Sequence, residues 1–300
     1  MEVLVTGSSG FVGSHLTEAL VARKHRVRVL IRPGTSLSPW LTGLPVIPVE
    51  AAYDDPQALR RALTGVTTII HAGGVTRGIN VRDYYEGNAA PTLALLQAAV
   101  SLKKPPARFV LISSHAMMGP APSPAMPSRE DDMPMPVEAY GASKLAAELL
   151  ARSFSHRLPV TIIRPPSVYG PRDRDFLVLF RQLARHCNLF YGNADKYTGL
   201  VYVDDLVEGI LKAAFSPRAV NRAYFICGEE GITWRQLQKA IKEGGGCRAL
   251  TIRIPACTTR LAAWAGGIKM RITGRATLVN REKARMGAPR CWCLSGERAA

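Results

Sequence analysis

The fold of this chain is decided by the stretch Thr6-Gly7-Ser8-Ser9-Gly10-Phe11-Val12-Gly13. An apolar run before it, Val3-Leu4-Val5, predicts a strand, and residues 14–24 after it predict a helix. Glycines in such a turn let the backbone approach a pyrophosphate, and the helix N-terminus offers free N–H groups and the positive end of its dipole. The stretch therefore predicts a dinucleotide site formed by Gly7, Ser9, Gly10, Phe11, Val12 and Gly13.

Strand and helix patterns alternate through the first half of the chain. Further strands are expected at residues 27–31, 44–49, 67–71, 108–113 and 160–164, and helices at 57–63, 88–102 and 138–155. Such alternation predicts βαβ units with right-handed crossovers. The expected fold class is therefore α/β, with a doubly wound parallel sheet of Rossmann type.

The pattern changes after Gly170. Helices are expected at 176–187, 204–215 and 233–242, strands at 200–203 and 224–227, and irregular structure after Gly244. We expect a dinucleotide-binding domain over residues 1–170, to which residues 199–227 return. A smaller C-terminal substrate-binding domain is expected over residues 171–300.

Composition and charge narrow the class of protein. The 300 residues are 47% hydrophobic, enough for a large core, and the formal net charge is +16. Almost all of the excess lies in residues 151–300, which indicates an anionic ligand, an anionic membrane surface, nucleic acid, or only an arginine-rich solvated face. No nucleic-acid-binding motif accompanies the charge, so nucleic acid is not expected as a partner.

Targeting and metal signals are weak. The sequence shows no signal peptide and no apolar run of about 18 residues, so we expect a cytoplasmic protein without a membrane span. Residues 254–268 form an amphipathic-looking stretch, which leaves peripheral membrane contact open beside ordinary core packing. The six cysteines include no Cys-x-x-Cys pair, so we expect reduced thiols and no metal.

The end of the second strand bears on the choice of cofactor. An acidic residue there would accept a hydrogen bond from the 2′-hydroxyl of NAD. The residue is Arg32, which cannot accept one, but its guanidinium can pair with the 2′-phosphate of NADP. The cofactor is therefore expected to be NADP or NAD, with Arg32 favouring NADP. Stacking on adenine is the alternative role for Arg32.

Tyr140 and Lys144 are four residues apart at the start of an expected helix, so their side chains share a face. A free phenol has a pKa of about 10, and a nearby ammonium or an oxidised nicotinamide ring favours the phenolate. Tyr140 could then exchange a proton with an alcohol or a ketone, and Ser114 would hydrogen-bond the same oxygen. We expect Ser114, Tyr140 and Lys144 to be catalytic, with Lys144 also holding the nicotinamide ribose.

Six prolines between residues 116 and 136 exclude regular helix and central strand. A long loop is therefore expected to join Ser114 to Tyr140, and long loops in compact domains are usually functional. His115 precedes this loop. It is a candidate second acid–base group, or it packs on the loop.

Together these motifs resemble an extended short-chain dehydrogenase/reductase of the NAD-dependent epimerase/dehydratase superfamily. The resemblance runs from Val3 to about Leu211, and it rests on the glycine loop, Ser113-Ser114 before Gly119, Tyr140-x-x-x-Lys144, residues 164–171 and Val203-Asp204-Asp205. It implies that His71, Ala72 and Gly73 form a turn under the cofactor ribose and that Asn88 opens the central helix. It also implies that Pro165, Ser167 and Val168 lie beside nicotinamide, and that helices 88–102 and 138–155 form a homodimer.

Several positions depart from the family pattern. Arg32 replaces the acidic ribose reader, Ala51-Ala52 stand where a Gly-Asp pair usually lies near adenine, and His115-Ala116 replace the Asp-Glu pair of sugar dehydratases. Dehydration is therefore not expected. Met117-Met118 replace Val-Tyr, and their thioethers would form an apolar wall.

That wall favours the hydroxysteroid-dehydrogenase-like and dihydroflavonol-reductase-like branches, which the tail from Glu282 also resembles. Because chains of those branches continue further, the substrate domain is expected to be truncated.

Three functions stay open. The first is an epimerase of a nucleotide sugar, and the second is a dehydrogenase or reductase of a hydrophobic alcohol or ketone. The third is a non-catalytic, NAD(P)-binding redox sensor, against which the Ser–Tyr–Lys set argues. The prediction common to the first two is an NAD(P)-dependent oxidoreductase or epimerase that transfers a hydride at a carbon bearing a hydroxyl or keto group of a small molecule.

Overall fold

The computed structural model describes the chain except for residues 192, 229–230, 247, 255–257, 259–290 and 300. The amphipathic-looking stretch at 254–268 and the start of the tail from Glu282 lie almost wholly outside the described residues.

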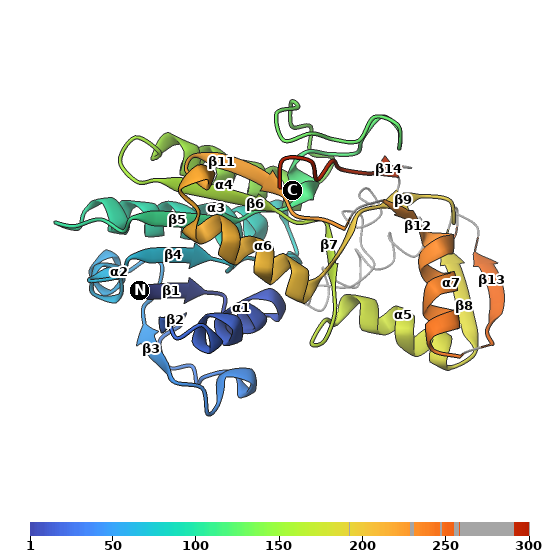
Figure 1. The fold of residues 1–300 in the computed structure, drawn as a ribbon, viewed down its shortest axis with the longest axis horizontal. Helices are drawn as coiled ribbons and strands as arrows, with labels where there is room; N and C mark the ends of the chain where they lie inside the picture. The colour runs from blue at the N-terminus through green and yellow to red at the C-terminus, as the bar shows by residue number, and fades with distance from the viewer. Residues whose placement is uncertain (192, 229–230, 247, 255–257, 259–290, 300) are drawn as a thin grey trace.

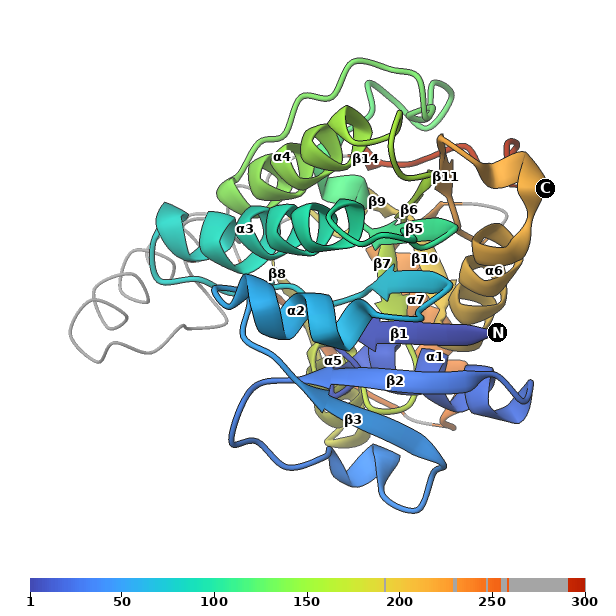
Figure 2. The same cartoon turned by 90° about the vertical axis from the view of Figure 1, so that its left-hand side faces the viewer.

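A seven-stranded parallel sheet forms the centre of the larger part of the molecule, in the order β11-β6-β5-β4-β1-β2-β3 (Figures 1 and 2). The strands are β1 (Glu2–Thr6), β2 (Arg26–Ile31), β3 (Val46–Glu50), β4 (Thr68–His71), β5 (Arg108–Ile112), β6 (Val160–Arg164) and β11 (Arg222–Phe225). The strand order reverses at β1, as in a doubly wound sheet. The predicted fold class is confirmed.

Helices cover both faces of this sheet (Figure 2). One face carries α2 (Pro56–Leu63), α3 (Val81–Val100) and α4 (Ala139–Ser153), and the other carries α1 (Phe11–Ala22) and α6 (Val203–Phe215). Because both faces are covered, β4, β5 and β6 are buried along their whole length, which explains their continuous apolar runs.

The start of α3 differs from the sequence expectation. The helix was expected at residues 88–102, but it begins at Val81 and ends at Val100, so Asn88 lies within it and does not open it. A capping box formed by Asn80 and Asp83 fixes the earlier start. Pro91 inside the helix hides this continuity in the sequence, because proline normally marks a helix end.

The smaller part of the molecule lies beyond β7 and is built from short elements (Figure 1). They are β7 (Ser167–Tyr169), α5 (Asp175–Ala184), β8 (Cys187–Tyr191), β9 (Tyr197–Thr198), β10 (Leu200–Tyr202), β12 (Ile232–Thr233), α7 (Trp234–Gly244), β13 (Leu250–Ile254) and β14 (Cys291–Trp292). Thr233 caps α7 as predicted. The expected irregular structure after Gly244 is wrong where β13 pairs with β8 and β14 pairs with β9. The division into two domains stays a prediction.

The proline-rich loop is held by the C-terminal tail. Ala121 and Ser128 donate backbone hydrogen bonds to the carbonyls of Cys291 and Cys293, both at 3.1 Å, and Ser295 donates to Ser128 at 2.9 Å. Backbone hydrogen bonds therefore join the loop after the 3₁₀ turn His115–Met117 to residues 291–295, which are far away in the sequence. This pairing was not visible in the sequence, because neither segment has a strand pattern.

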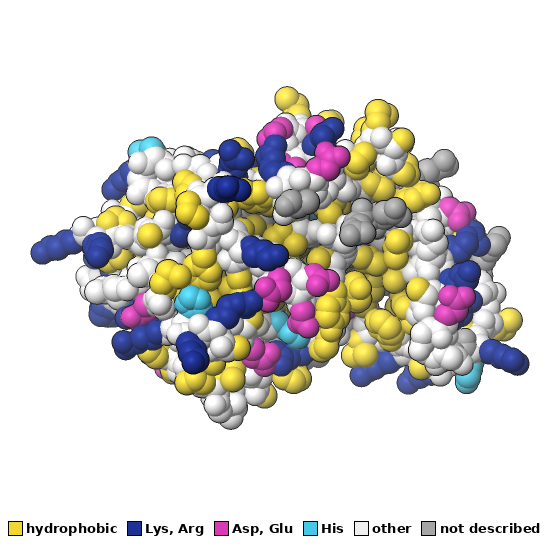
Figure 3. Space-filling view, viewed as in Figure 1, with side chains coloured by type: hydrophobic (Ala, Val, Ile, Leu, Met, Phe, Trp, Pro, Cys, Tyr) yellow, Lys and Arg dark blue, Asp and Glu magenta, His cyan; other side chains and the backbone are white. Residues whose placement is uncertain are grey.

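The exposed surface carries mixed charge. On the face shown in Figure 3, lysine and arginine side chains are scattered among acidic and apolar ones and do not gather in one patch. Within the part of the chain that the structure describes, no helix combines the length and the apolar character needed to cross a bilayer.

Candidate active site

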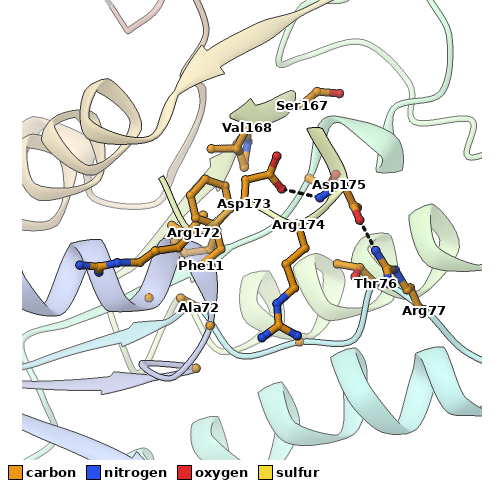
Figure 4. Close-up of a pocket in the computed structure, with 18 of the residues that line it drawn as sticks. Phe11, Ala72, Thr76, Arg77, Ser167, Val168, Arg172, Asp173, Arg174 and Asp175 are labelled. Atoms are coloured by element: carbon orange, nitrogen blue, oxygen red, sulfur yellow. Dashed lines mark hydrogen bonds and ion pairs between the residues drawn. The ribbon is translucent and has the colours of Figure 1, made fainter. Parts of the chain in front are cut away.

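A cavity of about 850 Å³ lies at the carboxyl ends of the central strands, between the glycine loop and the segment that follows β7 (Figure 4). Most of the predicted site residues meet in its wall. They are Gly7, Ser9, Gly10, Phe11, Val12, Gly13, Ala72, Ser114, Tyr140, Lys144, Pro165, Ser167 and Val168.

The glycine loop is shaped for close approach of a ligand to the backbone. Gly7 has φ +70°, and a Cβ there would lie 2.5 Å from the amide nitrogen of Gly73. A Cβ on Gly13 would overlap the Gly7 carbonyl oxygen, so α1 packs tightly under the turn. The helix begins at Phe11 with no side-chain cap and no acidic residue in its first turn. Its positive end is therefore available to a phosphate, and the cradle fits a dinucleotide.

Four predicted cofactor residues do not line this cavity: Arg32, His71, Gly73 and Asn88. Arg32 is exposed at the end of β2. The His71 ring is buried and lies 2.6 Å from the Thr6 hydroxyl, which also accepts a hydrogen bond from the Gly73 amide at 3.2 Å. His71 and Gly73 thus support the floor of the loop from behind.

The Asn88 side chain hydrogen-bonds to both the loop after β4 and helix α4. Its side-chain amide exchanges two hydrogen bonds with the backbone of Val75, at 2.9 and 3.0 Å, and donates a third to the Ser143 hydroxyl at 2.9 Å. Ser143 precedes Lys144 on α4. Asn88 therefore ties the loop after β4, which lines the cavity, to the helix that carries the predicted catalytic lysine.

Ser114, Tyr140 and Lys144 meet at one end of the cavity. Lys144 is buried, donates a hydrogen bond to the Ile112 carbonyl at 3.0 Å, and lies 6.0 Å from the centre of the Tyr140 ring. Glu138 caps α4 by accepting hydrogen bonds from the amides of Tyr140 and Gly141, both at 2.6 Å. The cap fixes the first turn of α4, so that the phenol points toward the end of β5.

Burial dominates the protonation of this group. It raises the pKa of Tyr140 to about 12, an effect that Glu138 increases and a hydrogen bond from Ser114 opposes. Burial also lowers the pKa of Lys144 to about 8, against the charge of Glu148. The expectation that the Lys144 charge favours the phenolate stays a prediction. The raised pKa keeps the Tyr140 phenol protonated at neutral pH, so it can donate a proton.

A second cavity of about 290 Å³ adjoins the first and shares Ser114 and Tyr140 with it. Its wall combines hydroxyl and charged groups with aromatic rings. The lining includes Thr76, His115, Ser167, Asp175, Lys196, Tyr197, Thr198, Trp234 and Trp292. Sequence reasoning missed Trp234 and Trp292, because only the pairing of β9 with β12 and β14 brings these tryptophans to the site.

The proposed thioether wall is wrong. Met117 and Met118 are 1% and 5% exposed, pack against Phe225, and line neither cavity. The expected packing of His115 on the proline-rich loop stays a prediction. The His115 ring lies edge-to-face against Phe225 and Trp292, with centroid separations of 5.5 and 5.7 Å. The sequence argument for a hydrophobic substrate therefore loses its thioether wall.

The segment after β7 lies over the larger cavity (Figure 4). On one side of the cavity, Arg172 forms an ion pair with Glu18 at 2.6 Å, and its guanidinium lies 4.7 Å from the centre of the Trp40 ring. On the other side, Asp175 forms an ion pair with Arg77. Arg174 points into the cavity between them. We name residues 171–175 the strap.

The ion pairs that hold the strap predict slow release of a dinucleotide. We expect Arg172→Ala to raise the dissociation rate of NADH about fivefold, because one partly exposed ion pair contributes about 1 kcal/mol at most. Stopped-flow fluorescence after displacement with excess NAD measures this rate. Arg23→Ala removes the exposed pair with Glu208 outside the cavity and serves as the control. Equal rates in both variants would show that the strap does not retain the nucleotide.

The buried His71 predicts a loss of stability in acid. Burial, with a smaller contribution from the Lys144 charge, lowers the pKa of His71 from 6.5 to about 3. Below pH 6.5 the unfolded chain therefore binds a proton that the folded chain does not, so the free energy of unfolding falls as pH drops toward 3. Denaturant unfolding at pH 7 and 4.5 should show that His71→Gln loses about 2 kcal/mol less than the parent protein over this interval. If His71→Gln and the parent protein lost the same unfolding free energy between pH 7 and 4.5, a neutral, buried His71 would be contradicted.

The fold and the glycine loop define a Rossmann-type, dinucleotide-binding class of protein. The model of the NAD dependent epimerase/dehydratase family matches residues 3–227, and the chain belongs to this family. The resemblance inferred from the motifs is thereby confirmed.

Similar proteins include both reductases and epimerases. The ceramide reductase of Caulobacter vibrioides is 28% identical over 253 residues, which cover 84% of this chain and 73% of the relative. The UDP-glucose 4-epimerase of Vibrio cholerae is 24% identical over 290 residues, 93% of this chain and 84% of the relative.

Solved structures share the fold of this chain. MoeE5 in complex with UDP-glucose and NAD is 27% identical, with a TM-score of 0.74 and coverage of 85% of this chain and 86% of that one. The UDP-glucose 4-epimerase of Thermus thermophilus in complex with NAD has a TM-score of 0.79 at 23% identity, over 100% and 92% of the two chains, and supports the fold.

Proposed function

We propose that this protein is an NAD(P)-dependent oxidoreductase or epimerase that moves a hydride at a carbon bearing a hydroxyl or keto group. The observation that carries the proposal is that Ser114 and Tyr140 line both cavities while Lys144 lines the larger one beside them. The larger cavity fits a dinucleotide on the glycine loop, and the smaller one offers a place for the substrate. A bound nicotinamide dinucleotide would supply the hydride donor or acceptor.

The chain's own groups supply the proton. Tyr140, protonated at neutral pH, donates to the oxygen of a ketone, and Ser114 holds the same oxygen by a hydrogen bond. In the oxidation of an alcohol, the Tyr140 phenolate must accept the hydroxyl proton. The raised pKa of Tyr140 makes this transfer favourable once the phenolate has formed. Lys144 is largely protonated below pH 8 and stabilises that phenolate by its charge.

The smaller cavity supports a polyhydroxylated substrate such as a nucleotide sugar. Hydroxyl, imidazole, ammonium and carboxylate groups converge in its wall, and such groups can hydrogen-bond the hydroxyls of a sugar. Trp234 and Trp292 offer flat apolar faces beside them. These faces, and the similarity to a ceramide reductase, support the second candidate, a reductase of a ketone with an apolar tail.

The choice between NAD and NADP depends on the end of β2. Arg32 is exposed there and supports NADP, since its guanidinium can pair with a 2′-phosphate. The two solved structures described above hold NAD. Glu50, the last residue of the neighbouring strand β3, accepts a hydrogen bond from the Gly34 amide at 3.4 Å, and its charge would disfavour a phosphate there. Homodimerisation through α3 and α4 stays a prediction.

Native mass spectrometry of the freshly purified protein tests the proposal, followed by incubation with UDP-glucose. An epimerase returns its hydride within one turnover, so retained NAD and formation of UDP-galactose support the nucleotide-sugar function. A site that fills preferentially with NADPH, with NADPH oxidation by a long-chain aliphatic ketone, supports the second candidate. A protein that binds neither nucleotide contradicts both.

A further inference from the structure

One polar group in the smaller cavity has no role in the proton transfer described above. His115 is only 3% exposed, and its Nε2 has no hydrogen-bond partner among the described residues. Buried polar atoms are nearly always satisfied, and an unsatisfied one is destabilising. Nε2 therefore has an unused hydrogen-bonding capacity in a residue that lines the smaller cavity.

The position of the ring limits what can use this capacity. His115 follows Ser114 directly and lines the smaller cavity together with Ser114 and Tyr140. Edge-to-face contacts with Phe225 and Trp292 hold the imidazole on two sides, so it cannot swing out to water. A substrate whose reacting oxygen lies at Ser114 and Tyr140 presents its neighbouring atoms to this ring.

We propose that His115 is a specificity-determining residue, which hydrogen-bonds a substrate oxygen on the carbon next to the reacting carbon. The proposal rests on the proposed function and names its substrate class: a vicinal diol in one redox state and an α-hydroxy ketone in the other. A ketone without the neighbouring oxygen leaves the imidazole unpaired, and sites that hydrogen-bond a substrate hydroxyl reject analogues that lack it.

The protonation of the ring fits recognition rather than acid catalysis. Burial lowers the pKa of His115 to about 4, and the nearby charge of Arg164 contributes to this shift. The imidazole is therefore neutral at pH 7, where one ring nitrogen donates and the other accepts. It can bind either a hydroxyl or a carbonyl without a change in charge.

A pair of ring-sized probes, trans-1,2-cyclohexanediol and cyclohexanol, separates this role from the hydride transfer. The NAD-loaded protein, labelled with ¹⁵N at its histidines, is titrated with each probe, and His115→Phe identifies the His115 signals. Absorbance at 340 nm follows NAD reduction in parallel. We expect the diol to shift the imidazole signals of His115 and cyclohexanol to leave them unchanged. We also expect the diol to be oxidised at least tenfold more efficiently.

The variants define the outcome. His115→Phe keeps the ring contacts and should lose the preference for the diol, whereas His115→Gln keeps a donor and an acceptor and should restore part of it. NADH affinity should stay unchanged in both variants. A shift of the His115 signals without turnover would support the recognition role and contradict the proposed hydride transfer. The absence of a shift with the diol, or a preference that persists in His115→Phe, would overturn the inference.

Discussion

Replacing Tyr140 with phenylalanine should lower kcat by about 10²- to 10⁴-fold while the Kd for NADH changes less than about twofold. The hydroxyl is the only group removed, and it belongs to a ring that is fixed by the Glu138 cap and lies beside Ser114. The ring itself stays in place, because Phe fills the same volume next to Tyr84. Steady-state kinetics with the accepted substrate and fluorescence titration with NADH measure the two effects.

Tyr85→Phe is the matched control, since this tyrosine lies on α3 and is 39% exposed. It should leave both kcat and Kd unchanged. Loss of NADH binding in Tyr140→Phe would mean that the phenol is structural. Full activity in that variant would assign the proton transfer to another group.

The second large effect is expected at the glycine loop. A Cβ on Gly13 would overlap the Gly7 carbonyl oxygen, so Gly13→Ala must displace backbone on the inner side of the turn. Because the loop binds phosphate through its amides and the end of α1, this displacement should weaken NADH binding at least about 100-fold, or about 2.7 kcal/mol. Fluorescence titration measures the affinity, and thermal unfolding checks that the fold is kept.

Two further glycines make the result specific. Gly10→Ala should have a smaller effect, because the nearest atom to its Cβ is the Gly7 carbonyl oxygen at 3.2 Å. Gly244→Ala, at the end of α7, meets nothing within 4 Å and should bind NADH like the parent protein. Parental affinity in Gly13→Ala would remove the loop from the proposed cofactor site.

Sequence patterns located most of the Rossmann-type part because its signals are local. The strands at 108–113 and 160–164 and the helix at 138–155 end within two residues of β5, β6 and α4. The helix at 88–102 was misplaced because Pro91 masks a helix that the Asn80 cap starts earlier. The tail after Gly244 was misjudged because β13 and β14 are defined by their partners, β8 and β9, and not by their own pattern.

Local sequence was sufficient to predict the glycine turn, the shared face of Tyr140 and Lys144, and the family, since each depends on residues close together in the chain. The walls of the smaller cavity depend on long-range packing, which brings Trp292 from the C-terminal tail against His115, just after β5. In the folded chain, Met117 and Met118 are core residues, and His71 is buried beneath the glycine loop. The burial and the pKa of a side chain depend on the residues packed around it. Those residues come from distant parts of the chain, so local sequence patterns do not reveal them.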